Sequence, residues 1–403
     1  MWTLNGGWTM GLSFKRIAPL ALLLLAACGE NPSRSPDPPD AHWVSEPAFQ
    51  IGDALAGDAL FGFIPSLRVS PDGRRVHVLE PYEAKVSVWT PDGRRLFDVG
   101  GTGKGPGDFM LPYRVHLGDS WFYVRDQSRF TYFSNDRKVL RTVPNPPTLL
   151  NYQGFPIRVN AHLSDGSFLG FPTRKPPTGL ELGCRDDAEE KPVLRVRETG
   201  TGWVHEVVFR RKYGNGTLAV PIGIGCYYGP HPYSDADLYW ADPDAGSVVV
   251  VRMSLDDLDP GRSELFEVSA AGDTLWKRGL AFQPIRLTLD MLEAALNDLE
   301  SVLDDRFRRD AVERALDAPE YLPAVSDFAL ASNGRIWLRS PEVLDTLSVW
   351  YSLERGDTES PLRRVLLPEG FELMDATDTH VWGVWKDELD INYVVGRRLV
   401  PGS

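Results

Sequence analysis

Two near-identical hexapeptides, SPDGRR at residues 70–75 and TPDGRR at residues 90–95, are separated by a short β-rich segment. The runs beside them include VHVL at residues 76–79 and VSVW at residues 86–89. An Asp-Gly pair between such runs favours a hairpin turn, because glycine readily adopts the positive φ that tight turns require. The hexapeptides therefore predict two β-hairpins in quick succession.

Weaker versions of this turn recur along the chain, at residues 164–167, 271–273 and 332–335. Short strands that are interrupted this often are typical of an all-β repeat protein. The chain divides into six such units, at residues 66–100, 113–143, 158–211, 233–280, 323–368 and 370–400.

The sixth unit offers three clear strands, at residues 371–376, 380–385 and 391–399. We expect Trp43–Ile51 to supply its fourth strand, because a strand from the opposite terminus would close a ring and remove the exposed sheet edges. Closure of this kind predicts one large domain over residues 42–403.

A helical pattern interrupts the β-rich units. Residues 288–316 hold leucines at helical spacing, and Thr288 or Asp290 can cap the start of the helix. The pattern predicts a helical insertion at about residues 285–320, between the fourth and fifth units. Its apolar stripe is expected to pack on the ring, and a partner-binding helix is the alternative. The leucines are Leu292, Leu296, Leu299 and Leu303.

Residues 1–27 are predicted to be a signal peptide. Lys15 and Arg16 precede an uncharged run at residues 17–27, which is too short to cross a bilayer. The run leads into LAAC at residues 25–28, which resembles the lipobox of bacterial lipoproteins. This resemblance implies acylation of Cys28, and a chance cysteine after an ordinary signal peptide is the alternative. The proline-rich residues 28–41 are predicted to be a flexible tether.

The glycine-rich stretch GGTGKGPGDF at residues 100–109 raises the question of phosphate binding. A Walker-type loop needs a Ser or Thr after its lysine and a following helix, whereas Lys104 is followed by Gly105. We therefore interpret the stretch as a corner between two units, with Phe109 packed between them. Lys104 and Asp108 remain candidates for ligand binding. The residues that shape the turn are Gly103, Gly105, Pro106 and Gly107.

The turn-rich repeats, this corner with Pro112 after it, and the LAAC tetrad together resemble the six-bladed β-propeller lipoproteins of bacteria, which are similar to NHL-repeat propellers. The resemblance covers nearly the whole chain after residue 28. It implies an all-β, six-bladed propeller and carries no agreed catalytic residues.

Catalytic motifs are missing from the sequence. The seven histidines do not occur in metal-ligand spacing, and neither His-Glu-x-x-His nor Gly-x-Ser-x-Gly is present. We therefore predict no catalytic residue, no metal site and no cofactor. His231 and Trp385 are further candidates for ligand binding. The formal net charge of −13 disfavours nucleic acid as a partner.

Three functions fit these observations. The favoured one is a non-catalytic binding or assembly module of a bacterial cell envelope, periplasmic or surface-facing, with a protein, small molecule or glycan as ligand and a lipid anchor as its only membrane contact. The rival is a metal-dependent hydrolase or lyase of the propeller lactonase type, with ligands gathered at the channel mouth. The third is a structural scaffold whose channel is merely filled.

Cysteine pairing is expected in the exported protein. Acylation of Cys28 would leave Cys184 and Cys226, an even pair under oxidising conditions. The unit boundaries place both in long loops on the same face, which predicts a disulfide between them. Two reduced, buried cysteines are the alternative.

Overall fold

The computed structural model describes residues 42–52, 60–147, 150–173, 190–213, 216–222, 225–253, 260–302 and 309–402. These residues belong to the compact unit Ser35–Ser403. The predicted signal peptide and tether, with Cys28, lie outside the described residues. Cys184 does too, and only the backbone is described at Cys226, so neither the predicted acylation nor the predicted disulfide falls within the described structure.

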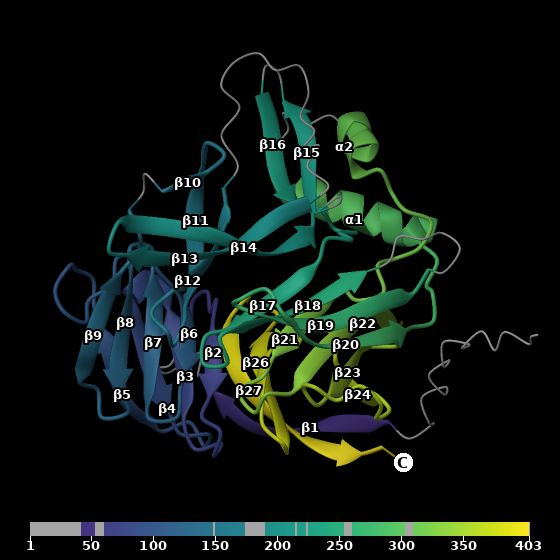
Figure 1. The fold of residues 1–403 in the computed structure, drawn as a ribbon. Coiled ribbons are helices and arrows are strands. Elements are labelled where there is room, and N and C mark those ends of the chain that lie inside the picture. The colour runs from purple at the N-terminus through teal and green to yellow at the C-terminus, as the bar shows by residue number, and fades with distance from the viewer. Residues whose placement is uncertain are drawn as a thin grey trace, which may run out of the picture. The chain divides into compact units, whose positions relative to one another are not determined.

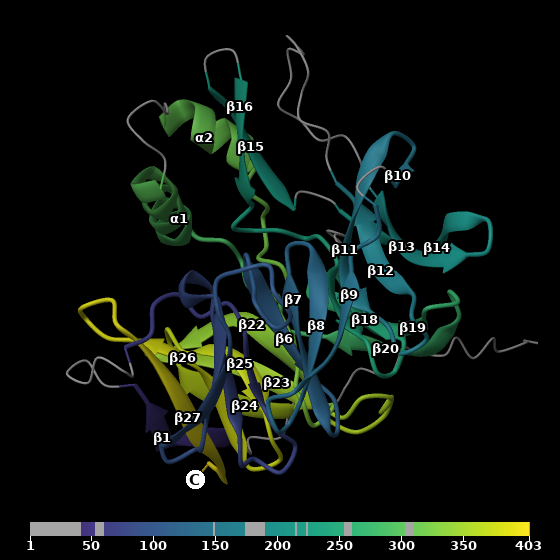
Figure 2. The same ribbon diagram turned by 90° about the vertical axis from the view of Figure 1, so that its left-hand side faces the viewer.

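Most of the described chain forms antiparallel sheets in which strands adjacent in sequence are hydrogen-bonded neighbours (Figures 1 and 2). The first sheet contains β2 (Leu67–Val69), β3 (Val76–Glu80), β4 (Lys85–Trp89) and β5 (Arg95–Gly100), with a 3₁₀ turn, η2 (Pro81–Glu83), between β3 and β4. The second contains β6 (Pro112–Leu117), β7 (Trp121–Asp126), β8 (Arg129–Ser134) and β9 (Val139–Pro144). The third contains β10 (Asn151–Tyr152), β11 (Phe155–His162), β12 (Phe168–Pro172), β13 (Glu190–Thr199) and β14 (Gly202–Lys212).

The remaining strands continue this pattern. β17 (Leu238–Asp242), β18 (Ser247–Met253), β19 (Arg262–Ser269) and β20 (Thr274–Ala281) form a further four-stranded sheet. Two more series follow, β21 (Asp327–Leu330), β22 (Ile336–Leu344), β23 (Leu347–Leu353) and β24 (Arg363–Pro368), then β25 (Glu372–Ala376), β26 (His380–Lys386) and β27 (Asn392–Pro401).

The strand from the amino-terminal side, β1 (Trp43–Ile51), joins the last two series. It pairs with β27 along its whole length in antiparallel register, as the sequence predicts. Its first two residues, Trp43 and Val44, also pair in parallel with Val365 and Leu366 of β24. The last two predicted units therefore share one eight-stranded sheet, which differs from the separate sheets that the repeats predict. The extra pairing gives two outer strands a hydrogen-bonding neighbour each.

Apolar cores lie between consecutive sheets. β18 shows why, because Val248 and Val250 pack toward β11–β14 while Val249 and Val251 pack toward β21–β24. All four valines are fully buried, as expected for a strand covered on both faces.

The same alternation continues around the structure. Clusters join β2–β5 to β6–β9, β6–β9 to β11–β14, and β21–β24 to β25–β27. A further cluster joins β25–β27 and β1 back to β2–β5, through Trp382, Ile51 and Val69 among others. The sheets therefore close on themselves, and the fold is an all-β propeller, which confirms this part of the prediction.

The glycine-rich corner connects β5 to β6. Phe109 is fully buried in the core between β2–β5 and β6–β9, and its ring meets Phe133 edge-on at 6.0 Å between centroids. The guanidinium of Arg129 donates hydrogen bonds to the carbonyl oxygens of Lys104, Gly105 and Asp108. The corner is therefore tied both to a core and to the first residue of β8.

Two insertions pack on each other to form a small cap. One is the hairpin of β15 (Thr217–Ile222) and β16 (Gly225–Pro230), and the other contains α1 (Leu289–Val302) and α2 (Arg309–Leu316), all gathered together in Figures 1 and 2. Leu218, Val220, Leu296, Val312 and Leu316 share a core of their own. The apolar stripe thus covers this hairpin, whereas the sequence predicts that it packs on the ring. This hairpin lies between the third and fourth predicted units, in a stretch for which the sequence predicts only a long loop.

The start of α1 agrees with the predicted cap, since the hydroxyl of Thr288 accepts a hydrogen bond from the backbone N–H of Met291 at 3.3 Å. No helix within the described ranges is both long and apolar enough to span a membrane.

Phe109 gives a direct test of the inter-sheet packing. Replacing it with alanine should lower the free energy of unfolding by about 3–5 kcal/mol, because the change leaves a cavity between two sheets that cannot fully collapse. The matched control is Phe63→Ala, since Phe63 is 59% exposed. Chemical denaturation measures both variants, and equal losses would contradict the packing role of Phe109.

Candidate functional site

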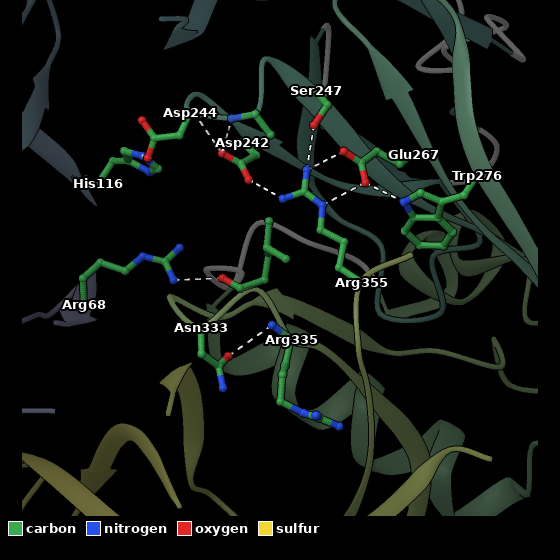
Figure 3. A network of polar contacts seen from close by, with 12 residues as sticks. Arg68, His116, Asp242, Asp244, Ser247, Glu267, Trp276, Asn333, Arg335 and Arg355 are labelled. Carbon is green, nitrogen blue, oxygen red and sulfur yellow. Dashed lines mark hydrogen bonds and ion pairs between the residues drawn. The ribbon is translucent and has the colours of Figure 1, made fainter. Parts of the chain in front are cut away.

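A polar network joins residues of β6 and of β17–β20 to the loop between β23 and β24 (Figure 3). Arg355, in the loop between β23 and β24, lies at its centre. Its Nε donates to Glu267 Oε2 at 2.8 Å, its Nη2 donates to Ser247 Oγ at 2.8 Å, and its Nη1 forms an ion pair with Asp242. Trp276 Nε1 donates to Glu267 Oε2 at 2.6 Å. Arg355 therefore binds the β17–β20 sheet to the loop of the next series.

The network holds Glu267 as a carboxylate although its side chain is only 5% exposed. Burial acts to raise the pKa of Glu267, but hydrogen bonds from Arg355, Ser247 and Trp276 outweigh burial and lower the pKa below its usual value. Burial likewise acts to lower the pKa of Arg355, and the carboxylates of Glu267 and Asp242 reverse that effect and raise it.

His116 extends this network from the second sheet. It lies on β6, and its Nε2 is 3.1 Å from Asp244 Oδ2 in the turn between β17 and β18. Its ring also stacks on Tyr123, with 5.1 Å between centroids. One ligand atom each from His116, Asp242 and Asp244 lie within 4.8 Å of one another, so these three residues could hold a metal ion.

Asp242 is already engaged within this group. Its Oδ1 accepts the backbone N–H groups of Asp244 and Ala245, and its Oδ2 is paired with Arg355. A cation at the group would therefore share a carboxylate with the guanidinium of Arg355, which would repel it.

The first strands of the sheets bring two arginines onto one aromatic ring. The guanidinium carbon of Arg68 on β2 lies 4.6 Å from the ring centroid of Trp240 on β17, and that of Arg114 on β6 lies 4.5 Å from it. Arg68 also donates to the carbonyl oxygen of Leu330 at 2.9 Å and lies 3.5 Å from Asp375. Arginine and tryptophan side chains thus occupy the region where β2, β6 and β17 approach one another.

Asp375 on β25 secures this region. It is fully buried, and its carboxylate accepts hydrogen bonds from the backbone N–H groups of Val69 and Ser332 and from the Ser332 hydroxyl. The Asp375 carboxylate therefore links β25 to the end of β2 and to the turn after β21.

The structure does not gather the four predicted binding residues into one site. Lys104 and Asp108 share the corner loop, where Asp108 Oδ2 accepts the N–H of Gly105 at 3.0 Å. A side chain at Gly103 would collide with the same carboxylate, so the carboxylate of Asp108 occupies the interior of the loop. Trp385 is 37% exposed on β26.

The fourth residue, His231, belongs to the cap. It is buried, its Nε2 bonds to the carbonyl oxygen of Leu316 at 2.6 Å, and its Nδ1 accepts the N–H of Tyr233. Because both ring nitrogens are used, the contacts of His231 are those of a structural residue.

The sequence does not predict a role for Arg355 or the grouping of His116 with Asp242 and Asp244. The only sequence signal is the pair of aspartates in Asp242-Pro243-Asp244, and His116 is too distant in sequence for any spacing rule to reach it. The prediction of no metal site stays a prediction, and spacing along the chain could not point to His116 because the fold brings it to Asp242 and Asp244 from another sheet.

No family model matches the chain. No curated protein matches it either. Solved structures align with most of its length at low identity. One is a member of the DUF4221 family from Bacteroides vulgatus, with 9% identity, 90% of this chain and 99% of that chain covered, and a TM-score of 0.47.

Two more aligned structures are the Cps50 (Swd1) β-propeller domain of Myceliophteria thermophila and a streptogramin B lyase. The first has 10% identity, covers 88% of this chain and 100% of that chain, and has a TM-score of 0.38. The second has 10% identity, covers 89% and 98%, and has a TM-score of 0.38. Similarity at this level carries no inference about activity.

The Arg355 network predicts a stability effect that depends on pH. Arg355→Met should lower the free energy of unfolding by about 2–4 kcal/mol at neutral pH, because Glu267 and Asp242 lose their counterion while remaining largely buried. Because the pKa of Glu267 is lowered below its usual value of 4.5, the network contributes its full stability above pH 4.5 and loses it as the pH falls further. The stabilities of the two proteins should therefore converge in acid.

The control is Arg398→Met, which removes an exposed ion pair with Glu46 and should cost less than about 1 kcal/mol. Denaturant titrations from pH 7 to well below pH 4 measure the difference. A loss for Arg355→Met that matches Arg398→Met would contradict a stabilising network.

Proposed function

We propose that this chain is a six-bladed propeller, held at a bacterial cell-envelope membrane by a lipid on Cys28, that binds a ligand without transforming it. The observation that carries the proposal is a pair of arginine side chains on the first strands of two sheets, β2 and β6. Arg68 and Arg114 meet over Trp240, and guanidinium groups stay protonated at neutral pH. Such groups hold and orient a ligand but do not exchange protons with it.

Six blades are supported by the strand order. Four series of four strands and one of five, β10–β14, follow one another along the chain, and β25, β26, β27 and β1 make a sixth when β1 is assigned to β27. The cap supports a binding role, because function is often carried by long insertions on a rigid scaffold. The predicted signal peptide and LAAC tetrad support the location.

The anchor is tested by Cys28→Ser in the full chain. The variant should move from the membrane to the soluble envelope fraction, because a lipid on Cys28 is the proposed membrane contact. Cys226→Ser is the matched control and should stay with the membrane. Quantitative immunoblots of the fractions read the result, and full membrane retention of Cys28→Ser would overturn the anchor.

A metal-dependent hydrolase or lyase is the second candidate, and the group of His116, Asp242 and Asp244 is the observation that favours it. A metal there could polarise a carbonyl or activate water. The ion pair between Arg355 and Asp242 favours the first candidate, because it places a fixed positive charge on one of the three ligands.

Metal retention separates the two candidates. Protein incubated with Zn²⁺ or Ca²⁺ and then dialysed should retain a substoichiometric amount and should not open lactone rings. Arg355→Met should retain more metal, since it frees the Asp242 carboxylate. Elemental mass spectrometry provides the readout. Stoichiometric retention by the unaltered chain that Asp244→Asn abolishes would instead establish the metal site and favour the enzyme.

A further inference from the structure

Three arginines lie around Tyr113 with no carboxylate partner among the described residues. The guanidinium carbon of Arg125 on β7 is 4.3 Å from the Tyr113 ring centroid, and that of Arg158 on β11 is 5.8 Å from it. Arg114 follows Tyr113 in β6, and its positive charge acts to lower the pKa of Arg125. No hydrogen bond or ion pair joins any of the three to another described residue, whereas Arg68, Arg252 and Arg355 each have an acidic partner.

The acidic residue nearest in sequence is already occupied. Asp126 follows Arg125, is fully buried, and accepts the backbone N–H groups of Met110, Leu111 and Gln127. Another acidic residue, Asp327 at the start of β21, has Arg339 as its cationic neighbour. Within the described residues, no ion pair therefore compensates the positive charge of the cluster, in a protein whose net charge is −13.

Burial makes this arrangement costly without a ligand. Arg125 is only 3% exposed, and its Nε is buried without a hydrogen-bond partner among the described residues. Burial, with the positive charges of Arg114 and Arg158, lowers its pKa to about 10, so both of these cations repel that of Arg125. A buried unpaired cation of this kind is stabilised by an incoming anion.

The cluster reaches from the interior to solvent. Arg125 is buried, Arg114 is half-buried and Arg158 is exposed. A register shift between Pro112 and Arg114 marks a β-bulge at Tyr113, and bulges re-aim side chains at binding sites. The rings of Tyr113 and Trp240 hold two of the guanidinium groups, which limits the entropy lost when a ligand is bound.

We propose that Arg114, Arg125 and Arg158 bind an oxyanion, a carboxylate or a phosphate group carried by a small ligand. The guanidinium fork matches the paired oxygens of either group. This inference rests on the proposed binding function and names the class of ligand.

The experiment uses residues 28–403 with the substitution Cys28→Ser. This protein is titrated with citrate and with inorganic phosphate at constant ionic strength. Isothermal calorimetry should show saturable binding of at least one of them, and the comparison identifies a carboxylate or a phosphate as the preferred group. Arg158→Gln should weaken binding about 10- to 100-fold, since it removes hydrogen bonds to a charged group. Because Arg158 is exposed, this variant is expected to fold, and Arg114→Gln should give a similar loss.

The matched control is Arg137→Gln. Arg137 is also exposed, and its guanidinium carbon lies 5.6 Å from the Phe97 ring centroid. Arg137→Gln therefore removes one positive charge and one guanidinium–ring contact, as Arg158→Gln does. Its affinity should be unchanged. Absence of saturable binding of both probes, or an equal loss in Arg137→Gln, would overturn the inference. A glycan or protein ligand that binds the unaltered chain and Arg158→Gln equally would also overturn it, while leaving the proposed binding function intact.

Discussion

Apolar packing between neighbouring sheets is the interaction on which this propeller depends. Every series of strands buries both faces, so each sheet is stabilised only when its two neighbours are in place, as the alternating valines of β18 show. The polar contacts follow from that arrangement. Arg355 reaches Glu267 and Asp242 because the core between β17–β20 and β21–β24 holds the two series together. The arginines around Tyr113 depend in the same way on the core between β6–β9 and β11–β14.

Much of the fold could be predicted because its signals are local. The Asp-Gly turns and the short β-rich runs identify most strands, and the missing strand in the last series points to Trp43–Ile51 as its partner. The parallel contact between β1 and β24 could not be foreseen, because it depends on where two outer strands meet after closure. The hairpin of β15 and β16 was missed for a related reason, since its stability comes from the helices that cover it.

The candidate sites were beyond the reach of sequence patterns. His116 and Asp244, like Arg68 and Trp240, come from different sheets, and no spacing along the chain encodes their proximity. Local sequence patterns instead made Lys104 and Asp108 of the glycine-rich corner candidates for ligand binding. In the structure, Arg129 binds carbonyl groups of this corner and the Asp108 carboxylate lies inside it. An unpaired arginine cluster is also invisible in a sequence, because the partners of a charge are known only after folding.

The pairing of β1 with β27 has a consequence for the order of events in the cell. Arg397 bonds to Ser45, a residue 352 positions earlier, so the ring stays open until β27 has been synthesised. Contacts of such long sequence separation form slowly. Until then the edges of β24 and β27 lack their neighbour and can pair with other chains. Completion of the propeller therefore waits for β27, and both edges are exposed in the interval between synthesis of β27 and arrival of β1.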